Sequence, residues 1–353
     1  MTTVALRSSS RVAAVVGLSV NVLSAAVAYA TTTRSVSLTC PVCGENVAAL
    51  VIMSTNTFGG QDSDLLTLAR GSQPILILPI ACTNCYYAGY KDDFEKGLKA
   101  PDTVRPQLRK TLKPPLPIRH TGQTMDVPAW ARYDLAAQTC TVTGQQAEVV
   151  AITYHRASWA VRLTADPLAD SPEGVREKVR SLIQDRLRSE KRADNQAAQE
   201  TEFGRQLTRQ LDTASQPDRL VIGLAAIALL RRHGENPLAA ETLGKLKGLM
   251  QAEDFQRLDK NLTESIERER TYQKKALALI EKLANDQQTK DEKRALFMYL
   301  GGELNRRLGQ PQEARAWFQK AGEQKGPVWI LELNAQQSKL VASESAPPGN
   351  GSK

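Results

Sequence analysis

The sequence contains two short motifs, Cys40-Pro-Val-Cys43 and Cys82-Thr-Asn-Cys85, that decide how its N-terminal part folds. In each motif two residues separate the cysteines, which is the spacing of a tetrahedral zinc site built from two tight turns. Backbone N–H groups in such turns donate to the thiolates and disperse their charge. The motifs therefore predict a structural Zn²⁺ held by all four cysteines, although the segment between them is longer than the ~15–20 residues of a usual zinc ribbon.

Two other uses of the cysteines stay open. In an oxidising compartment paired cysteines readily form disulfides, and a CxxC motif is also the redox centre of thioredoxin-like proteins. A redox centre of that kind follows a strand and opens a helix. The residues after Cys85, Tyr86-Tyr-Ala-Gly-Tyr90, do not begin a helix, so zinc is the favoured interpretation. An envelope thiol–disulfide redox protein that uses its CxxC pairs is the alternative function.

The first 30 residues have the pattern of a secretory signal peptide. Two arginines precede a mostly apolar stretch, and Ala28-Tyr-Ala30 matches an A-x-A cleavage site. The pattern predicts an exported protein, periplasmic or extracellular, whose mature chain begins near Thr31. The alternative is a membrane-anchored protein that keeps residues 12–28 as a single span. Contact with a membrane is expected only in that second case.

Composition and the lack of known motifs argue against two classes of function, nucleic-acid binding and catalysis. The chain has 353 residues and a formal net charge of +8, but no basic arm interleaved with aromatics and no nucleic-acid-binding motif, so no nucleic acid is expected as a partner. Its histidines, His120, His155 and His233, are scattered and lie in no catalytic motif, which argues against an enzyme. Cys140, outside the two motifs, is expected to pack as a small buried hydrophobe.

Residues 31–100 are expected to form a small β module that resembles a zinc ribbon. A turn-rich loop in this module contains Asp62 and Asp64. Two carboxylates without a third oxygen ligand make a poor calcium site, so these side chains are expected to shape the loop. Three short strands are predicted, at residues 35–38, 48–53 and 75–79.

The remainder of the chain has helical periodicity. Near its end, Gly302 and Ala314 stand where two antiparallel helices would touch, as in a tetratricopeptide repeat, although an ordinary helical bundle stays open. The predicted fold class is α+β, mostly α: a small N-terminal β zinc-ribbon-like module followed by an α-helical, tetratricopeptide-like array. The predicted parts are a signal peptide (1–30), the zinc-ribbon-like module (31–100), a Pro-rich linker (101–127), a helical repeat-like domain (128–340) and a disordered tail (341–353).

Taken together, several blocks of the sequence resemble the bacterial family catalogued as Domain of Unknown Function 2225. These blocks are Cys-Pro-Val-Cys-Gly, the loop Thr-Asn-Thr-Phe-Gly-Gly-Gln-Asp-Ser-Asp, Cys-x-x-Cys-Tyr-Tyr-Ala, Arg132-Tyr-Asp, Trp159-Ala-Val-Arg162 and the tetratricopeptide-like close. The resemblance covers about residues 38–325 and implies a zinc-ribbon-like module on a helical-repeat body. It implies no activity.

By this resemblance Cys40, Cys43, Cys82 and Cys85 are the metal ligands. The family usually has Gly after the last cysteine, whereas Tyr86 stands here, and a non-Gly residue in a left-handed turn costs about 1 kcal/mol. The second turn is therefore expected to be less regular than the first. The function predicted from all these features is an exported zinc-binding scaffold whose helical surface binds a protein or peptide partner.

Overall fold

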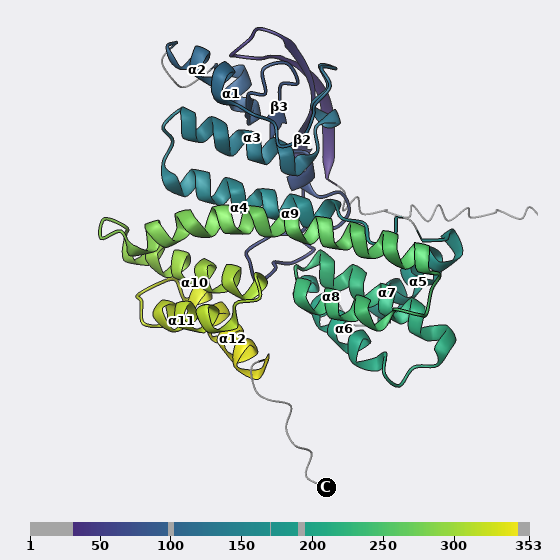
Figure 1. Ribbon diagram of the computed structural model, residues 1–353. Coiled ribbons are helices and arrows are strands. Elements are labelled where there is room, and N and C mark those ends of the chain that lie inside the picture. The colour runs from purple at the N-terminus through teal and green to yellow at the C-terminus, as the bar shows by residue number, and fades with distance from the viewer. Residues whose placement is uncertain (1–30, 98–101, 170, 190–194, 345–353) are drawn as a thin grey trace, which may run out of the picture.

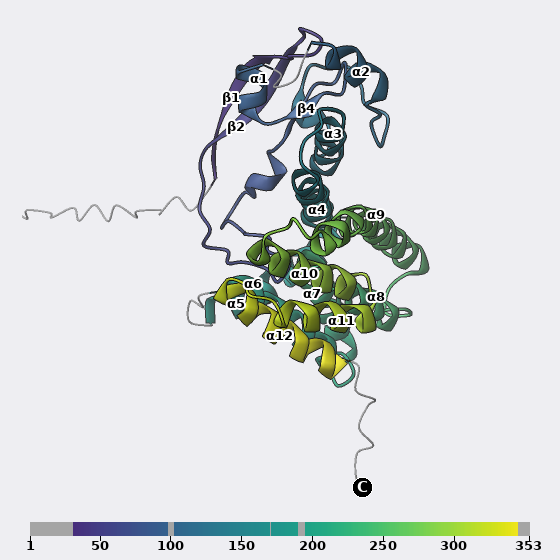
Figure 2. The ribbon, with the colours of Figure 1, turned by 90° about the vertical axis from the view of Figure 1, so that its left-hand side faces the viewer.

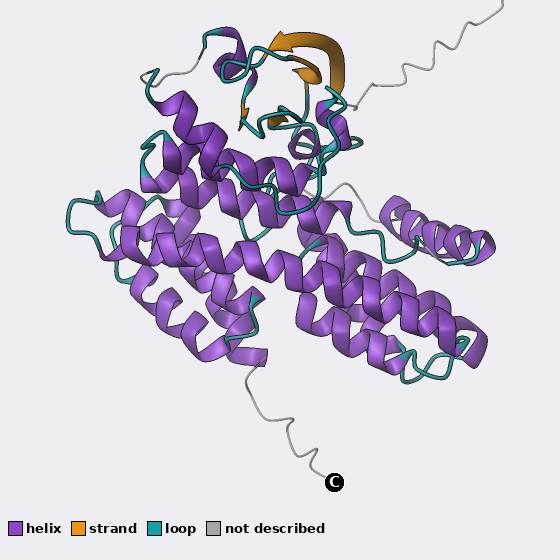
Figure 3. Cartoon of the chain, turned by 45° about the horizontal axis from the view of Figure 1, so that its top comes forward, coloured by secondary structure: helices purple, strands orange, loops and turns teal. Residues whose placement is uncertain are grey.

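The computed structural model of the chain describes residues 31–97, 102–169, 171–189 and 195–344. The predicted signal peptide, residues 1–30, lies outside the described residues, as do residues 345–353 of the predicted tail. Within the described part helices dominate, and two small two-stranded sheets lie near the N-terminus (Figure 1). The strands are confined to one end of the molecule (Figure 3). The predicted fold class is therefore confirmed.

Two antiparallel hairpins make up the β part of the molecule. β1 (Thr32–Thr39) pairs with β2 (Asn46–Ser54), and the first cysteine motif lies at the tip of this hairpin. β3 (Ile80–Ala81) pairs with β4 (Ala88–Gly89), and the second motif lies at the tip of that one. The strands predicted in the first hairpin are confirmed within β1 and β2.

The strand predicted at residues 75–79 is wrong. This segment is a 3₁₀ turn, η1 (Pro74–Leu76), followed by irregular chain up to β3. The buried guanidinium of Arg132 accounts for the difference, because it donates to three carbonyl groups of the segment that a strand ladder would need. Proline also has no N–H to contribute to such a ladder.

The stretch predicted as a Pro-rich linker, residues 101–127, contains ordered structure. Leu108 and Leu112 are buried in the same apolar core as the cysteines and β2. The core of the β module therefore extends through residue 112. The short helices of this region are α1 (Lys91–Glu95), α2 (Val104–Thr111) and the 3₁₀ turn η2 (Thr124–Asp126).

Three helices form the middle layer of the molecule. α4 (Ala147–Thr164) lies between α3 (Ala129–Val142), which carries the β module, and α9 (Ala252–Asn285), which carries the remaining helices (Figures 1 and 2). The long helix α9 contributes to two separate apolar cores. Leu258 and Leu262 in its first half belong to one, and Ala276 and Ile280 in its second half belong to the other.

Two groups of helices extend from the same side of α9, one at each end (Figure 1). We call them the first arm and the second arm. The first arm consists of α6 (Gln196–Gln210), α7 (Gln216–Arg232) and α8 (Asn236–Lys245), with α5 (Glu173–Ser189) packed on α7. The second arm consists of α10 (Asp291–Arg307), α11 (Pro311–Gly322) and α12 (Val328–Glu344).

Small residues bring α10 and α11 together as an antiparallel hairpin. A Cβ at Gly302 would lie 2.4 Å from the Phe318 ring, and Ala314 and Ala321 are fully buried. The contact positions predicted from the sequence are those that touch. Helix α12 continues to Glu344, four residues into the segment predicted as a tail.

Candidate metal centre

The two cysteine motifs fold into turns with the same hydrogen-bond pattern. In the first, Cys40 N donates to Glu45 O at 2.8 Å and Gly44 N donates to Cys40 O at 2.9 Å. In the second, Cys82 N donates to Tyr87 O at 2.8 Å and Tyr86 N donates to Cys82 O at 3.0 Å. Each motif is thus the rigid tip of a hairpin, and the two tips face each other across a small gap.

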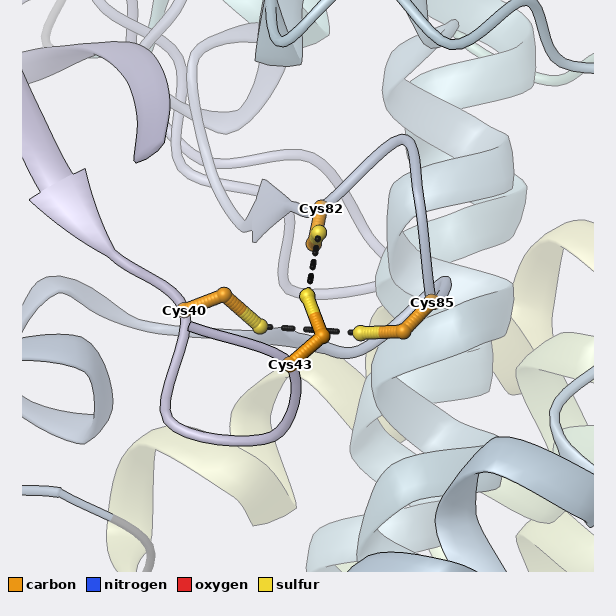
Figure 4. A group of neighbouring side chains, drawn as sticks. All are labelled: Cys40, Cys43, Cys82 and Cys85. Carbon is orange, nitrogen blue, oxygen red and sulfur yellow. Dashed lines mark hydrogen bonds between the residues drawn. The ribbon is translucent and has the colours of Figure 1, made fainter. Parts of the chain in front are cut away.

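The four sulfur atoms point into that gap from both turns (Figure 4). All four Sγ atoms lie within 4.8 Å of one another. The Sγ atoms of Cys40 and Cys85 are 3.6 Å apart, as are those of Cys43 and Cys82, so each close pair joins one turn to the other. The five cysteines of the described chain are free, and no disulfide links the two motifs.

This donor set fits a tetrahedral metal ion. Four Zn–S bonds of about 2.3 Å place the sulfurs about 3.8 Å apart, close to the separations found here. Thiolates select zinc or another soft metal, and four of them close the coordination shell. Cys40, Cys82 and Cys85 are buried and Cys43 is half-buried, which suits a structural site. Cys40, Cys43, Cys82 and Cys85 would hold the ion, and its role there would be to cross-link the two hairpins.

Backbone N–H groups of each turn stabilise negative charge on the sulfurs. Val42 and Cys43 donate to Cys40, and Asn84 and Cys85 donate to Cys82. Without a metal the cluster shares its protons unevenly. The contact between the Cys40 and Cys82 thiols raises the pKa of Cys40 and lowers the pKa of Cys82. A cation at the centre would instead favour the thiolate of every cysteine.

Tyr86 takes the left-handed conformation anticipated from the sequence. Its φ is +64°, and the equivalent residue of the first turn, Gly44, has φ +82°. The expectation that the second turn is less regular is not met in its hydrogen bonds, which repeat those of the first. Tyr86 is partly buried against the β-module core, and this packing offsets the backbone cost.

A second polar cluster lies away from the cysteines and was not anticipated as a site. The loop between β2 and η1, residues 57–69, enters the gap between the two arms below α9 (Figures 1 and 2). We call it the central loop. Asp64 accepts from Trp159 Nε1 at 2.9 Å and from Arg162 Nη1 at 2.9 Å. Asp62 accepts from Arg307 Nη2 at 2.9 Å.

These two carboxylates do shape their loop, because Asp62 accepts from Ser63 N and Asp64 from Leu66 N. Their larger role is long-range pairing with arginines. Burial alone would raise the pKa of Asp62, but Arg307 and the other cations outweigh it and hold that pKa well below its usual range. The loop and the Trp159–Arg162 segment can each be recognised in the sequence. Only the fold shows that Trp159 and Arg162 are partners of Asp64.

The histidines have different surroundings. His120 is exposed. His155 Nε2 lies 2.9 Å from the Asp64 carbonyl oxygen, and burial lowers the pKa of this imidazole. His233 lies between two carboxylates, 2.9 Å from Glu200 and 3.5 Å from Asp62. Burial lowers the pKa of His233, but the two carboxylate partners outweigh it and raise that pKa, which favours the imidazolium form.

Cys140 is half-buried and stands apart from the metal-ligand group. Burial raises the pKa of its thiol to about 11, so it is not an activated nucleophile. Among the described residues, the four clustered cysteines are the sole group of three or more His, Cys, Asp or Glu side chains arranged to hold a metal ion.

The sequence matches the family described as "Uncharacterized protein conserved in bacteria (DUF2225)" over residues 34–264 and 255–337. The chain belongs to this family. The match includes both cysteine motifs, the central loop and the second arm, so the family resemblance noted in the sequence is confirmed. No curated protein and no solved structure matches the chain. Across the described part of this family member, no helix has the length and apolar character needed to span a membrane.

Proposed function

We propose that this protein is a zinc-stabilised scaffold that binds a segment of a partner protein between its two arms. The observation that carries the proposal is a groove of about 740 Å³ at this place. Its floor contains Glu235, Arg306 and Arg307, and its walls come from both arms. The remaining lining residues are Glu202, Arg205, Thr208, Arg209, Asp212, Gly234, Pro237, Leu238, Glu241, Lys245 and Leu340.

The lining of the groove suits recognition better than catalysis. Its charged groups are paired with one another: Arg306 donates to both Glu235 and Glu303, and Lys245 pairs with Asp212 at 3.3 Å. A catalytic base or nucleophile would need a free lone pair aimed at a substrate. Paired charges on rigid helices instead offer fixed donors and acceptors, with Leu238 and Leu340 as apolar contacts, to a peptide backbone or side chains.

Zinc in this proposal is structural. The β module has a small core, and a closed four-thiolate shell supplies the cross-link that a small core needs. The redox alternative is less well supported, since each CxxC motif leads into a strand and not into a helix. We further propose that the protein is exported, with its mature N-terminus near Thr31. N-terminal sequencing of the protein from its native host tests this, and a chain that retains Met1 would contradict it.

Site-specific photocross-linking tests the binding role. A photoreactive residue at Glu241, exposed on the groove wall, is expected to capture one defined partner, while the same group at Asp259, exposed on α9, is not. Reversing the rim charges with Arg209→Glu and Lys245→Glu should abolish that adduct, whereas Lys260→Glu on α9 should leave it unchanged. Equal labelling from both positions, or an adduct insensitive to the rim charges, would contradict the proposal.

A further inference from the structure

The central loop contacts helix α4 and both arms. From α4, Arg162 and Trp159 bind Asp64. From the second arm, Arg307 binds Asp62, and Ser63 Oγ donates to Glu303 at 2.7 Å. Helix α10 makes a further contact through Tyr299, whose hydroxyl donates to the Ser63 carbonyl oxygen.

The first arm holds the other side of the same loop. His233, at the end of α7, lies 3.5 Å from Asp62, and Asn195, which caps α6, donates to the Gln61 carbonyl at 2.9 Å. Gly60 makes this approach possible, because a Cβ there would lie 2.4 Å from the Asn195 side chain. These seven polar contacts therefore attach one short loop to α4 and to both arms.

The loop is also connected to the floor of the groove. Glu303 accepts a hydrogen bond from Ser63 of the loop and forms ion pairs with both Arg306 and Arg307. Arg306 then pairs with Glu235 across the arms at 2.9 Å. Displacing the loop would take the Asp62 carboxylate away from Arg307, which would then keep Glu303 as its carboxylate partner, the group that Arg307 shares with Arg306. Removing one partner from a buried group of charges is unfavourable. The pairing of Arg306 with Glu235 thus depends on where the loop sits.

The two ends of the loop lead to the cysteines. β2 runs back from the loop to Cys43, and η1 and β3 run forward from it to Cys82. The four-cysteine cluster therefore closes the chain segment that contains the loop. Closing a segment at its ends removes conformations in which its middle lies elsewhere.

We propose that the central loop couples the metal centre to the groove: zinc at the cysteines keeps the loop seated, and the seated loop fixes the position of one arm relative to the other. This inference rests on the proposed zinc site and groove. It adds that loss of the metal loosens the groove floor at a distance. Partner binding would then respond to the supply of metal in the compartment.

Hydrogen exchange measured by mass spectrometry on the full chain tests this coupling. After zinc is removed by a chelator, amides of the central loop and of residues 231–235 and 303–310 should exchange about tenfold faster or more, whereas those of α11 should not change. Zinc content is measured in the same samples. If the purified protein contains zinc but the amides of both arms exchange at the same rate before and after chelation, the inference is overturned. The proposed scaffold would then still stand. Purified protein without zinc would contradict the proposed function itself.

Loop variants separate the role of the loop from that of the metal. Asp62→Asn keeps the size of the side chain but removes its charge, so it should keep zinc and still raise exchange at residues 231–235 and 303–310. The control is Asp212→Asn, an exposed carboxylate on the groove rim paired with Lys245, which should change neither. Unchanged exchange in Asp62→Asn, or uniform loss of protection throughout the chain on zinc removal, would overturn the inference.

Discussion

At the scale of single residues, sulfur position and backbone conformation decide the metal centre. Cys40 and Cys82 begin equivalent turns, and each donates its own N–H to the residue five positions later. This places the sulfurs of two distant motifs at separations that match the edges of a ZnS₄ tetrahedron. The fit comes from two hairpin tips of the same geometry, and Arg109 of α2 donates to the Val42 carbonyl of the first tip at 3.0 Å.

We expect one tightly bound zinc per chain, because a closed four-thiolate shell is characteristic of structural sites. Cys82→Ser should lose the metal and the folded state of the β module, seen as loss of zinc by elemental analysis and of protection in residues 31–97. Cys140→Ser is the matched control, since this thiol lies outside the cluster, and it should keep the metal. Two disulfides and no metal in the native protein would contradict this prediction.

A second residue-scale prediction concerns Gly44. Its φ is +82°, and a Cβ there would meet nothing within 4 Å, so Gly44→Ala isolates the cost of backbone conformation. We expect a loss of about 1 kcal/mol in the free energy of unfolding, measured by urea titration of the zinc-loaded protein. Gly174→Ala, equally open but with helical backbone in α5, should be neutral or slightly stabilising. Equal effects of the two changes would show that φ is not the cause.

At the scale of elements, helix α9 is the shared support of the molecule. Its two halves bury different apolar stripes, one in the core of the first arm and one in the core of the second. Each arm is otherwise built around its own core, so the groove between them is bounded by independently packed units. The arms meet through polar contacts, such as Arg306 with Glu235 and Arg307 with the His233 carbonyl.

Helices α10 and α11 of the second arm are closely packed against each other. Gly302→Ala would place a methyl group 2.4 Å from the Phe318 ring, and overpacking of this kind costs about 1–3 kcal/mol. We expect that loss in thermal or urea unfolding of the second arm, with zinc content unchanged. Gly244→Ala in α8, where a Cβ meets nothing within 4 Å, is the control and should not destabilise. A stable Gly302→Ala protein would mean that the two helices are less closely packed.

At the scale of the whole molecule, buried charges hold the layers together. The central loop, α4, α6, α7 and α10 meet at the pairs of Asp62 with Arg307, Asp64 with Arg162, and His233 with Glu200. Such a network is costly to bury but specific, because each member is satisfied only when every layer is in place. These pairs are the physical basis for our proposal that the central loop fixes the position of one arm relative to the other.

The network gives stability a defined pH dependence. His233 has a raised pKa, so its contribution is complete below its unfolded pKa of about 6.5 and is lost as the pH rises through its folded pKa. Glu200 has its pKa lowered to about 2, so its contribution is present above about pH 4.3 and is lost as the pH falls toward 2. Urea unfolding should therefore show a decline in stability on both the alkaline and the acid side.

His233→Gln isolates the alkaline limb of that profile. At about pH 6 the variant should be less stable than the natural protein by about 1.5–3 kcal/mol, because a charged hydrogen bond to Glu200 is lost. The difference should shrink as the pH rises and the natural imidazole loses its proton. A difference that stays constant with pH would show that His233 is neutral in the folded protein.

Local features of this protein could be predicted from its residues alone. Two CxxC motifs predicted the metal ligands, and helical periodicity with small contact residues predicted a helical body and the contact between α10 and α11, because these properties depend on spacings of a few residues. Irregular segments were harder to predict. Residues 75–79 are as apolar as a strand, but the Arg132 guanidinium of α3 donates hydrogen bonds to their carbonyl groups. The same limit applied to residues 101–127, whose prolines suggested a linker although Leu108 is fully buried.

The contacts of the central loop could not be predicted in this way, because they form between distant parts of the chain. Asp62 and Arg307 are 245 residues apart in the chain, and Asp64 and Arg162 are 98 apart. No local pattern links such residues, since their pairing is stabilised by burial and arises only after the helices have packed. The groove has the same origin: its walls come from α6, α8, α10 and α12, and its floor is an ion pair between two arms that are joined through α9 and the loop.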